Sequence, residues 1–176
     1  MIVTTKYIAS IVSTASPCAA GIEMAAQGGA TPGSADWIAA NEAIFVPFYL
    51  TQPVLVTRIF VVNGAVVSGN VDVGIYTQDG VLIVGGGGAA QAGTNQPQYF
   101  NIADTMLGAG RYYIACVLDN VTGRVFRSSI INARSRQIGI LRATSAYPLP
   151  SSVTFVELTS GGQSPVCGLE IAGGMI

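Results

Sequence analysis

The stretch Gln52–Asp79, QPVLVTRIFVVNGAVVSGNVDVGIYTQD, predicts two adjacent β-strands joined by a polar connection that contains glycine. The first strand is apolar on both faces and is interrupted only by Thr57 and Arg58, so we expect it to be central in a sheet or covered by a partner. In the second strand, apolar residues alternate with Asp72, Gly74 and Tyr76, the period-2 pattern of a strand with one buried face. We expect the two strands to form a hairpin-like nucleus.

The remainder of the chain repeats this pattern of short apolar segments separated by turn residues. Further strands are expected at 43–50, 81–84, 98–102, 111–118, 125–126, 153–158 and 166–171. Pro47 places the first of these at a sheet edge or a bulge, because proline donates no ladder hydrogen bond. No segment has the pattern of a long helix. The prediction is an all-β protein, an antiparallel β-sandwich or jelly roll with an extended N-terminal arm.

At 176 residues, the chain has the length of one domain with a sizeable core. We assign residues 1–35 to an N-terminal arm or edge segment and residues 36–176 to a single β-sandwich domain. Two interpretations of the first segment stay open. It is either an arm that docks on another molecule or an added edge strand of the same domain.

Charged side chains make up only 10% of the residues, against roughly 25% in ordinary soluble domains. Half of the residues are hydrophobic, and the mean hydropathy is +0.52. A membrane-spanning helix does not explain this, because the longest uncharged run contains GGGG, Asn95 and Pro97. The N-terminus lacks the apolar core of a signal peptide. We therefore expect a subunit whose surface is covered by copies of itself or by other chains, away from any membrane.

The residue types argue against an enzyme. The chain has no histidine, and Cys18, Cys116 and Cys167 have neither CxxC nor zinc-ligand spacing. The acidic residues occur singly, mostly beside turns, and Lys6 is the only lysine, which excludes a Walker-type phosphate loop. No catalytic residue, metal site or cofactor is expected. A net charge of −1 gives no reason to expect nucleic-acid binding.

Arginine is the most unusual polar feature of the chain. The candidate interface residues are Arg58, Arg124, Arg127, Arg134, Arg136 and Arg142. Such a set suits docking to acidic patches on a neighbouring protein, whereas the simpler interpretation is solvated edge-strand positions. Aromatic side chains that could bind a sugar are Tyr76, Tyr99, Tyr112 and Tyr113, although core or subunit packing is their more usual role.

The run ANEAIFVPFYLTQPVLVTRIFVVNGAVVSGNVDVGIYTQDGVLI, followed by MLGAGRYYIACVLD, resembles a domain of small virion proteins of tailed bacteriophages. The resemblance covers about residues 41–119 and consists of strands and turns. It implies a β-sandwich or jelly roll found in capsid decoration (cement) proteins, head fibres and tail-fibre tips, and it implies a homotrimer.

Since no shaft repeat or heptad precedes the domain, a decoration protein on the capsid surface is the preferred expectation. It would be made in the cytoplasm of the host bacterium and would bind the major capsid protein or another virion protein. The alternatives are a head- or tail-fibre module that recognises host surface glycans, or a cellular carbohydrate-binding module.

Overall fold

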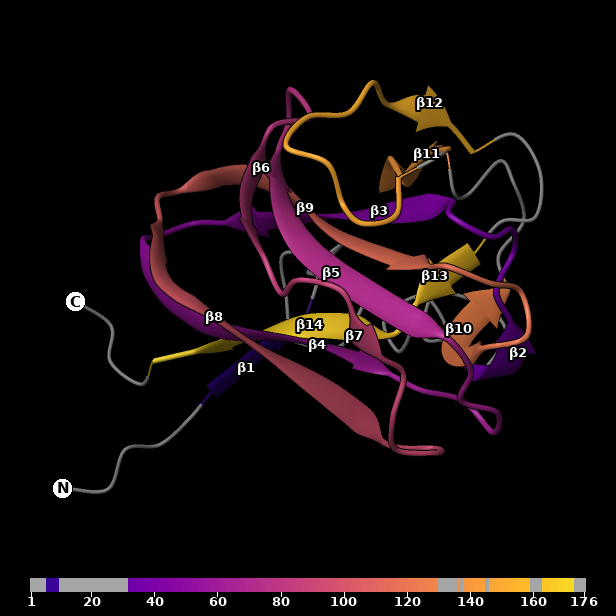
Figure 1. Ribbon diagram of the computed structural model, residues 1–176. Coiled ribbons are helices and arrows are strands. Elements are labelled where there is room, and N and C mark those ends of the chain that lie inside the picture. Colours follow the sequence, from indigo (N-terminus) through magenta and orange to yellow (C-terminus); the bar gives the residue numbers. More distant parts are fainter. Residues whose placement is uncertain are drawn as a thin grey trace, which may run out of the picture.

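The computed structural model describes residues 6–9, 32–129, 136, 138–144, 146–158 and 163–172. Every named element in these residues is a β-strand, and every strand pair is antiparallel (Figure 1). The predicted all-β, antiparallel fold is therefore confirmed. Jelly-roll connectivity stays a prediction.

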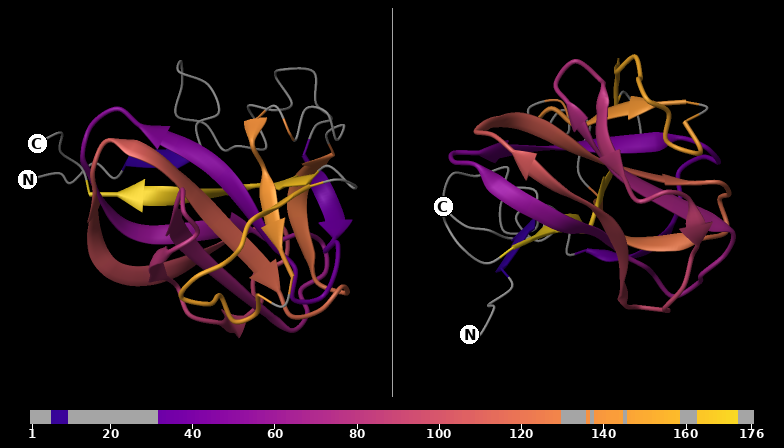
Figure 2. Two further views of the ribbon diagram at one scale, coloured as in Figure 1. Left: turned by 90° about the horizontal axis from the view of Figure 1, so that it is seen from above. Right: turned by 60° about the vertical axis from the view of Figure 1, so that its left-hand side comes forward.

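Two of the sheets pack face to face around the core, and a small third sheet lies beside them (Figure 2). The four-stranded sheet has the order β1 (Lys6–Ala9), β14 (Cys167–Ile171), β4 (Val54–Val62) and β8 (Pro97–Leu107). The larger sheet has the order β12 (Val156–Glu157), β11 (Leu141–Ala143), β3 (Ala43–Leu50), β9 (Gly110–Leu118), β5 (Asn70–Thr77) and β6 (Leu82–Gly85), with β7 (Ala89–Ala90) also paired to β5. The third sheet has the order β13 (Gln163–Pro165), β10 (Arg124–Ser129) and β2 (Gly33–Asp36).

Strand β4 lies between β14 and β8, so the prediction of a central strand is confirmed. The hairpin-like pairing of β4 with β5 is wrong, because β5 pairs with β9, β6 and β7 in the opposite sheet. The chain leaves the four-stranded sheet after Val62, and Asn63 then forms an isolated bridge with Val125 of β10 in the third sheet. Side-chain alternation predicts that a segment is a strand, but it carries no information about which strand lies beside it.

The outer face of the larger sheet is also buried. Strand β5 is buried from Val71 to Tyr76, although its alternation predicts one exposed face. Residues 146–155, here called the strap, cross this face between β11 and β12 (Figure 1). Ala146, Leu149 and Phe155 of the strap pack on the sheet and form a second apolar cluster with it. Asp72 and Tyr76, expected on a polar face, are therefore 3% and 0% exposed.

A buried amide network joins the loops at one end of the sandwich. The Gln91 Nε2 group donates to Asn63 Oδ1 (3.0 Å) and to the Arg124 carbonyl oxygen (2.7 Å). Asn63 Nδ2 in turn donates to Gln98 Oε1 at 2.9 Å. The glycine-rich segment 85–95 thus contains β7 and the buried Gln91.

The N-terminal residues that are described belong to the sheets. Strand β1 pairs with β14 as an edge strand, and β2 pairs with β10 from Gly33, inside the segment expected to be an arm. The rest of the predicted arm lies outside the described residues. Trp37 is 3% exposed and belongs to the core, and its Nε1 group donates to the Glu42 carbonyl oxygen at 2.9 Å.

Candidate functional site

The predicted interface arginines lie on different sheets. Arg58 is on β4 of the four-stranded sheet, whereas Arg124 and Arg127 are on β10 and Arg142 is on β11. Arg136 precedes β11, and Arg134 lies outside the described residues. The structure therefore places Arg58 in a separate sheet from the other described members of the set.

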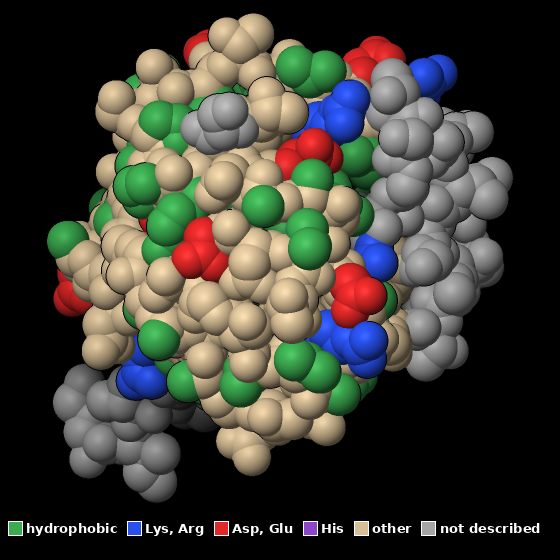
Figure 3. All heavy atoms as spheres, turned by 45° about the vertical axis from the view of Figure 1, so that its right-hand side comes forward, with side chains coloured by type: hydrophobic (Ala, Val, Ile, Leu, Met, Phe, Trp, Pro, Cys, Tyr) green, Lys and Arg blue, Asp and Glu red, His purple; other side chains and the backbone are tan. Residues whose placement is uncertain are grey.

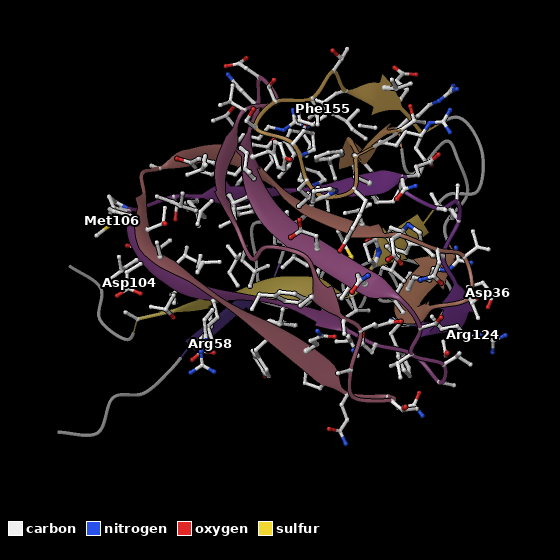
Figure 4. All side chains as sticks on the ribbon, in the orientation of Figure 1. Asp36, Arg58, Asp104, Met106, Arg124 and Phe155 are labelled. Carbon is white, nitrogen blue, oxygen red and sulfur yellow. The ribbon has the colours of Figure 1, made fainter. Side chains whose placement is uncertain are left out.

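Four of these arginines pair with an acid of the same chain. The closest pair joins Arg124 Nε to Asp36 Oδ1 at 2.6 Å, between directly opposed residues of β10 and β2 (Figure 4). The other pairs are Arg58 Nε–Glu170 Oε2 (3.4 Å), Arg142 Nη1–Glu42 Oε2 (3.5 Å) and Arg136 Nε–Glu157 Oε2 (3.7 Å). The Arg124–Asp36 and Arg136–Glu157 pairs are exposed on both sides and contribute little stability, about 0–1 kcal/mol. The main consequence of the four pairs here is that much of the predicted positive surface is neutralised.

Arg127 has no ion pair in the described part of the chain. Its Nε and Nη1 atoms are buried and make no hydrogen bond. Burial lowers the pKa of Arg127, and the nearby Asp36 carboxylate opposes that shift. Since two of its nitrogens are inaccessible, Arg127 is poorly placed to meet a partner's surface.

Arg58 lines a groove of about 430 Å³ on the four-stranded sheet. The groove coincides with a bulge: Val56 pairs with Thr105 and Arg58 pairs with Asn101, so residues 102–104 lie opposite a single residue of β4. Bulges of this kind re-aim side chains and occur often beside binding sites.

Hydrogen-bond donors and hydrogen-bond acceptors both line this groove. Glu170, Arg58 and Asn101 lie directly opposite one another on three neighbouring strands. Asp104 also lines the groove (Figure 4). The Glu170 side chain is 7% exposed and the Arg58 side chain 44% exposed. The guanidinium carbon of Arg58 lies 5.7 Å from the centre of the Tyr99 ring. The groove thus offers both hydrogen-bond donors and acceptors.

One further arginine was not identified from the sequence. Arg111 on β9 lies opposite Tyr49 on β3, and its guanidinium carbon is 5.6 Å from the Tyr49 ring centre and 5.2 Å from that of Tyr113. The sequence does indicate that Arg111 and Tyr113 share one face of a strand, because they are two residues apart. The cross-strand position of Tyr49 requires the sheet pairing.

The described residues contain no cluster of three or more side chains that could hold a metal ion. Cys116 and Cys167 are completely buried, and burial raises the pKa of Cys167 to about 12 and that of Cys116 well above its usual value. Buried thiols of this kind are poor nucleophiles.

Comparisons with protein-family models, curated proteins and solved structures found no match. No helix among the described residues is long and apolar enough to span a membrane.

Proposed function

We propose that this chain is a structural protein of a tailed-bacteriophage virion, a decoration (cement) protein that binds the capsid surface. The proposal combines the resemblance of residues 41–119 to small virion proteins with the character of the surface. Its partner would be the major capsid protein or another virion protein, and the bound form would be a homotrimer.

The observation that carries the proposal is a surface with few uncompensated charges and several large apolar side chains. On the face drawn in Figure 3, some blue and red side chains lie beside one another and others stand singly, with no large patch of one sign. Large exposed apolar side chains among the described residues are Tyr49, Val66, Val81, Tyr99, Met106, Val121 and Val156. Such a surface suits contact with other subunits, since interface cores are depleted in charge and enriched in aromatic residues and methionine.

Capsid binding provides the direct test. Purified protein is mixed with capsids that lack it, and the bound copies are counted by quantitative mass spectrometry. We expect a copy number of hundreds per particle and a higher temperature for DNA release, because a ligand that binds only the intact shell stabilises it. Protein that stays unbound, or that leaves the release temperature unchanged, contradicts the decoration role. Light scattering tests the trimer independently, and a stable monomer contradicts it.

The groove beside Arg58 favours a second candidate, a fibre-type module that recognises host surface glycans. Sugar hydroxyls both donate and accept hydrogen bonds, and Arg58, Asn101 and Asp104 offer both functions. A glycan array with the native protein and an Asn101→Ala, Asp104→Ala variant tests this candidate. The candidate is supported if the native protein binds a glycan and the double variant does not. It is contradicted if the native protein binds no glycan.

A further inference from the structure

The side chain of Arg111 is held between two tyrosine rings, in an arrangement here called the Tyr49–Arg111–Tyr113 stack. The inner ring, Tyr113, is 4% exposed and packs on Phe155 of the strap, with ring centres 4.9 Å apart. Phe155 packs in turn on Phe45 at 4.9 Å. The buried cluster therefore fixes the position of the guanidinium group before any partner arrives.

The charge of Arg111 has no counterpart in the described part of the chain. No acid lies within ion-pair distance of it there, and its Nε atom is buried without a hydrogen bond. Arg58, Arg124, Arg136 and Arg142 differ because each has an acid within 4.0 Å.

The outer side of the stack is open to solvent. Tyr49 is 52% exposed, whereas every other residue of β3 is buried. The backbone at Gly139 packs against the guanidinium group, since a β-carbon there would lie 2.6 Å from Arg111 Nη2. Arginine and tyrosine are the residue types that dominate binding energy at interfaces, especially where they are held in place before binding.

We propose that the Tyr49–Arg111–Tyr113 stack is the contact point for an acidic segment of a partner protein. A carboxylate of that segment would accept hydrogen bonds from the terminal Nη groups of Arg111, because its Nε atom is buried. The exposed Tyr49 ring would flank the pair. Charge complementarity selects this occupant, because the stack presents a cation that no acid among the described residues pairs with. A nucleic acid fits less well, since phosphate binding draws on many cations and most described arginines are already paired.

This proposal rests on the proposed function, because it names the place where the chain would meet another virion protein. The two can fail separately, since peptide binding is measured on the isolated protein and decoration on the particle. Loss of decoration with peptide binding intact would overturn the virion role alone.

The experiment is an NMR titration of the full-length ¹⁵N-labelled protein with a capped hexaglutamate peptide at low salt. We expect shifts centred on the Arg111 Nε–H and the amides around Tyr49, and at least a tenfold weaker dissociation constant for Arg111→Gln. Tyr49→Ala changes an exposed side chain, so it keeps the fold intact and is expected to weaken binding at least threefold. Arg124→Gln is the matched control, because its arginine is already paired with Asp36, and it is expected to bind as the native protein does.

Three results overturn the proposal. The first is unchanged peptide affinity in both Arg111→Gln and Tyr49→Ala. The second is a peptide response centred on β10 that Arg124→Gln abolishes. The third is tighter binding of a single-stranded DNA hexamer than of the peptide, with the DNA response centred on the stack.

Discussion

Asp72 and Leu149 connect the larger sheet to the strap that covers it. The Leu149 N–H donates to Asp72 Oδ2 at 3.0 Å, and the Val73 N–H donates to Oδ1 of the same carboxylate at 2.8 Å. Nearby, the Tyr76 hydroxyl donates to the Pro150 carbonyl oxygen at 2.6 Å. Two side chains of β5 thus hold the segment that buries the outer face of their own sheet.

Removing the Asp72 carboxylate is expected to destabilise the protein. Asp72→Ala leaves two buried N–H donors without an acceptor, which costs about 1–3 kcal/mol in the free energy of unfolding. Urea denaturation measures the change. Asp79→Ala is the control, because Asp79 is an exposed turn residue, and its effect should stay within about 0.5 kcal/mol. Equal stabilities of the two variants would contradict the anchoring role.

The Asp72 carboxyl also predicts a pH dependence of stability. Burial raises its pKa above 3.8, and the hydrogen bonds from Leu149 and Val73 only partly oppose this. The native state therefore binds the proton more tightly than the unfolded state, and the contribution of Asp72 to stability falls as pH rises through the interval just above 3.8. The stability difference between the native protein and Asp72→Asn should increase as pH is lowered through this interval. A difference that decreases instead would show that hydrogen bonding outweighs burial.

Gly69 and Gly87 allow two effects of adding a side chain to be measured separately: backbone strain and collision with neighbouring atoms. Both have positive φ values, +64° and +71°, where an L-residue is strained by about 1–2 kcal/mol. A β-carbon at Gly69 would also collide with Asp119 Oδ1 and Asn120 Nδ2, whereas one at Gly87 meets nothing within 4 Å. Gly69→Ala should therefore lower the free energy of unfolding by at least about 1 kcal/mol more than Gly87→Ala. Equal losses in urea denaturation would mean that the collision relaxes without cost.

The positions of the strands were largely predictable from the sequence, whereas their partners were not. Ala43–Leu50 is β3 with the predicted bounds, because its aromatic and β-branched residues and its flanking turns are local signals. Pro47 was expected at an edge or bulge. Among the described residues, β11 pairs only with residues 43–45 of β3. At Pro47, the strand that pairs with β3 is β9, on its other side, so Pro47 lies at a local edge of the sheet. The strap was missed because residues 146–155 combine prolines, serines and single aromatic residues without any period.

The candidate site was predictable only in part for the same reason. Arg58 was identifiable as a cation within an apolar strand, but its partner Glu170 lies far away in the sequence and meets it through the pairing of β14 with β4. Arg111 gives no comparable signal in the sequence, because it begins a strong apolar strand and has no cluster of basic residues around it. Its significance depends on Tyr49 and Gly139, which approach it only in the folded chain.

Asp119 is expected to show the opposite pH dependence to Asp72. Desolvation acts to raise its pKa, but hydrogen bonds from the Asn70 N–H, Asn120 Nδ2 and Asn70 Nδ2 prevail, and its pKa lies below 3.8. Its contribution to stability is therefore present above 3.8 and is lost as pH falls through the lowered pKa. Asp119→Asn places an amide against the donors of Asn70 and should lose about 1 kcal/mol near neutral pH. This loss, measured by thermal unfolding, should shrink below pH 3.8, and a loss that is constant with pH would contradict the assignment.

The two core cysteines are expected to resist alkylation in the folded protein. Cys116 and Cys167 are 0% exposed, and burial raises both pKa values, so little thiolate is present at pH 8 and iodoacetamide has no access to it. Peptide mapping by mass spectrometry should find neither residue modified until denaturant unfolds the chain. Cys18, outside the described residues, is mapped separately. Modification of Cys116 or Cys167 at the rate seen in denaturant would mean that the two packed sheets open readily. In that case Cys116→Ser, which places a hydroxyl in the apolar core, should cost far less than the roughly 1–3 kcal/mol expected for a closed sandwich.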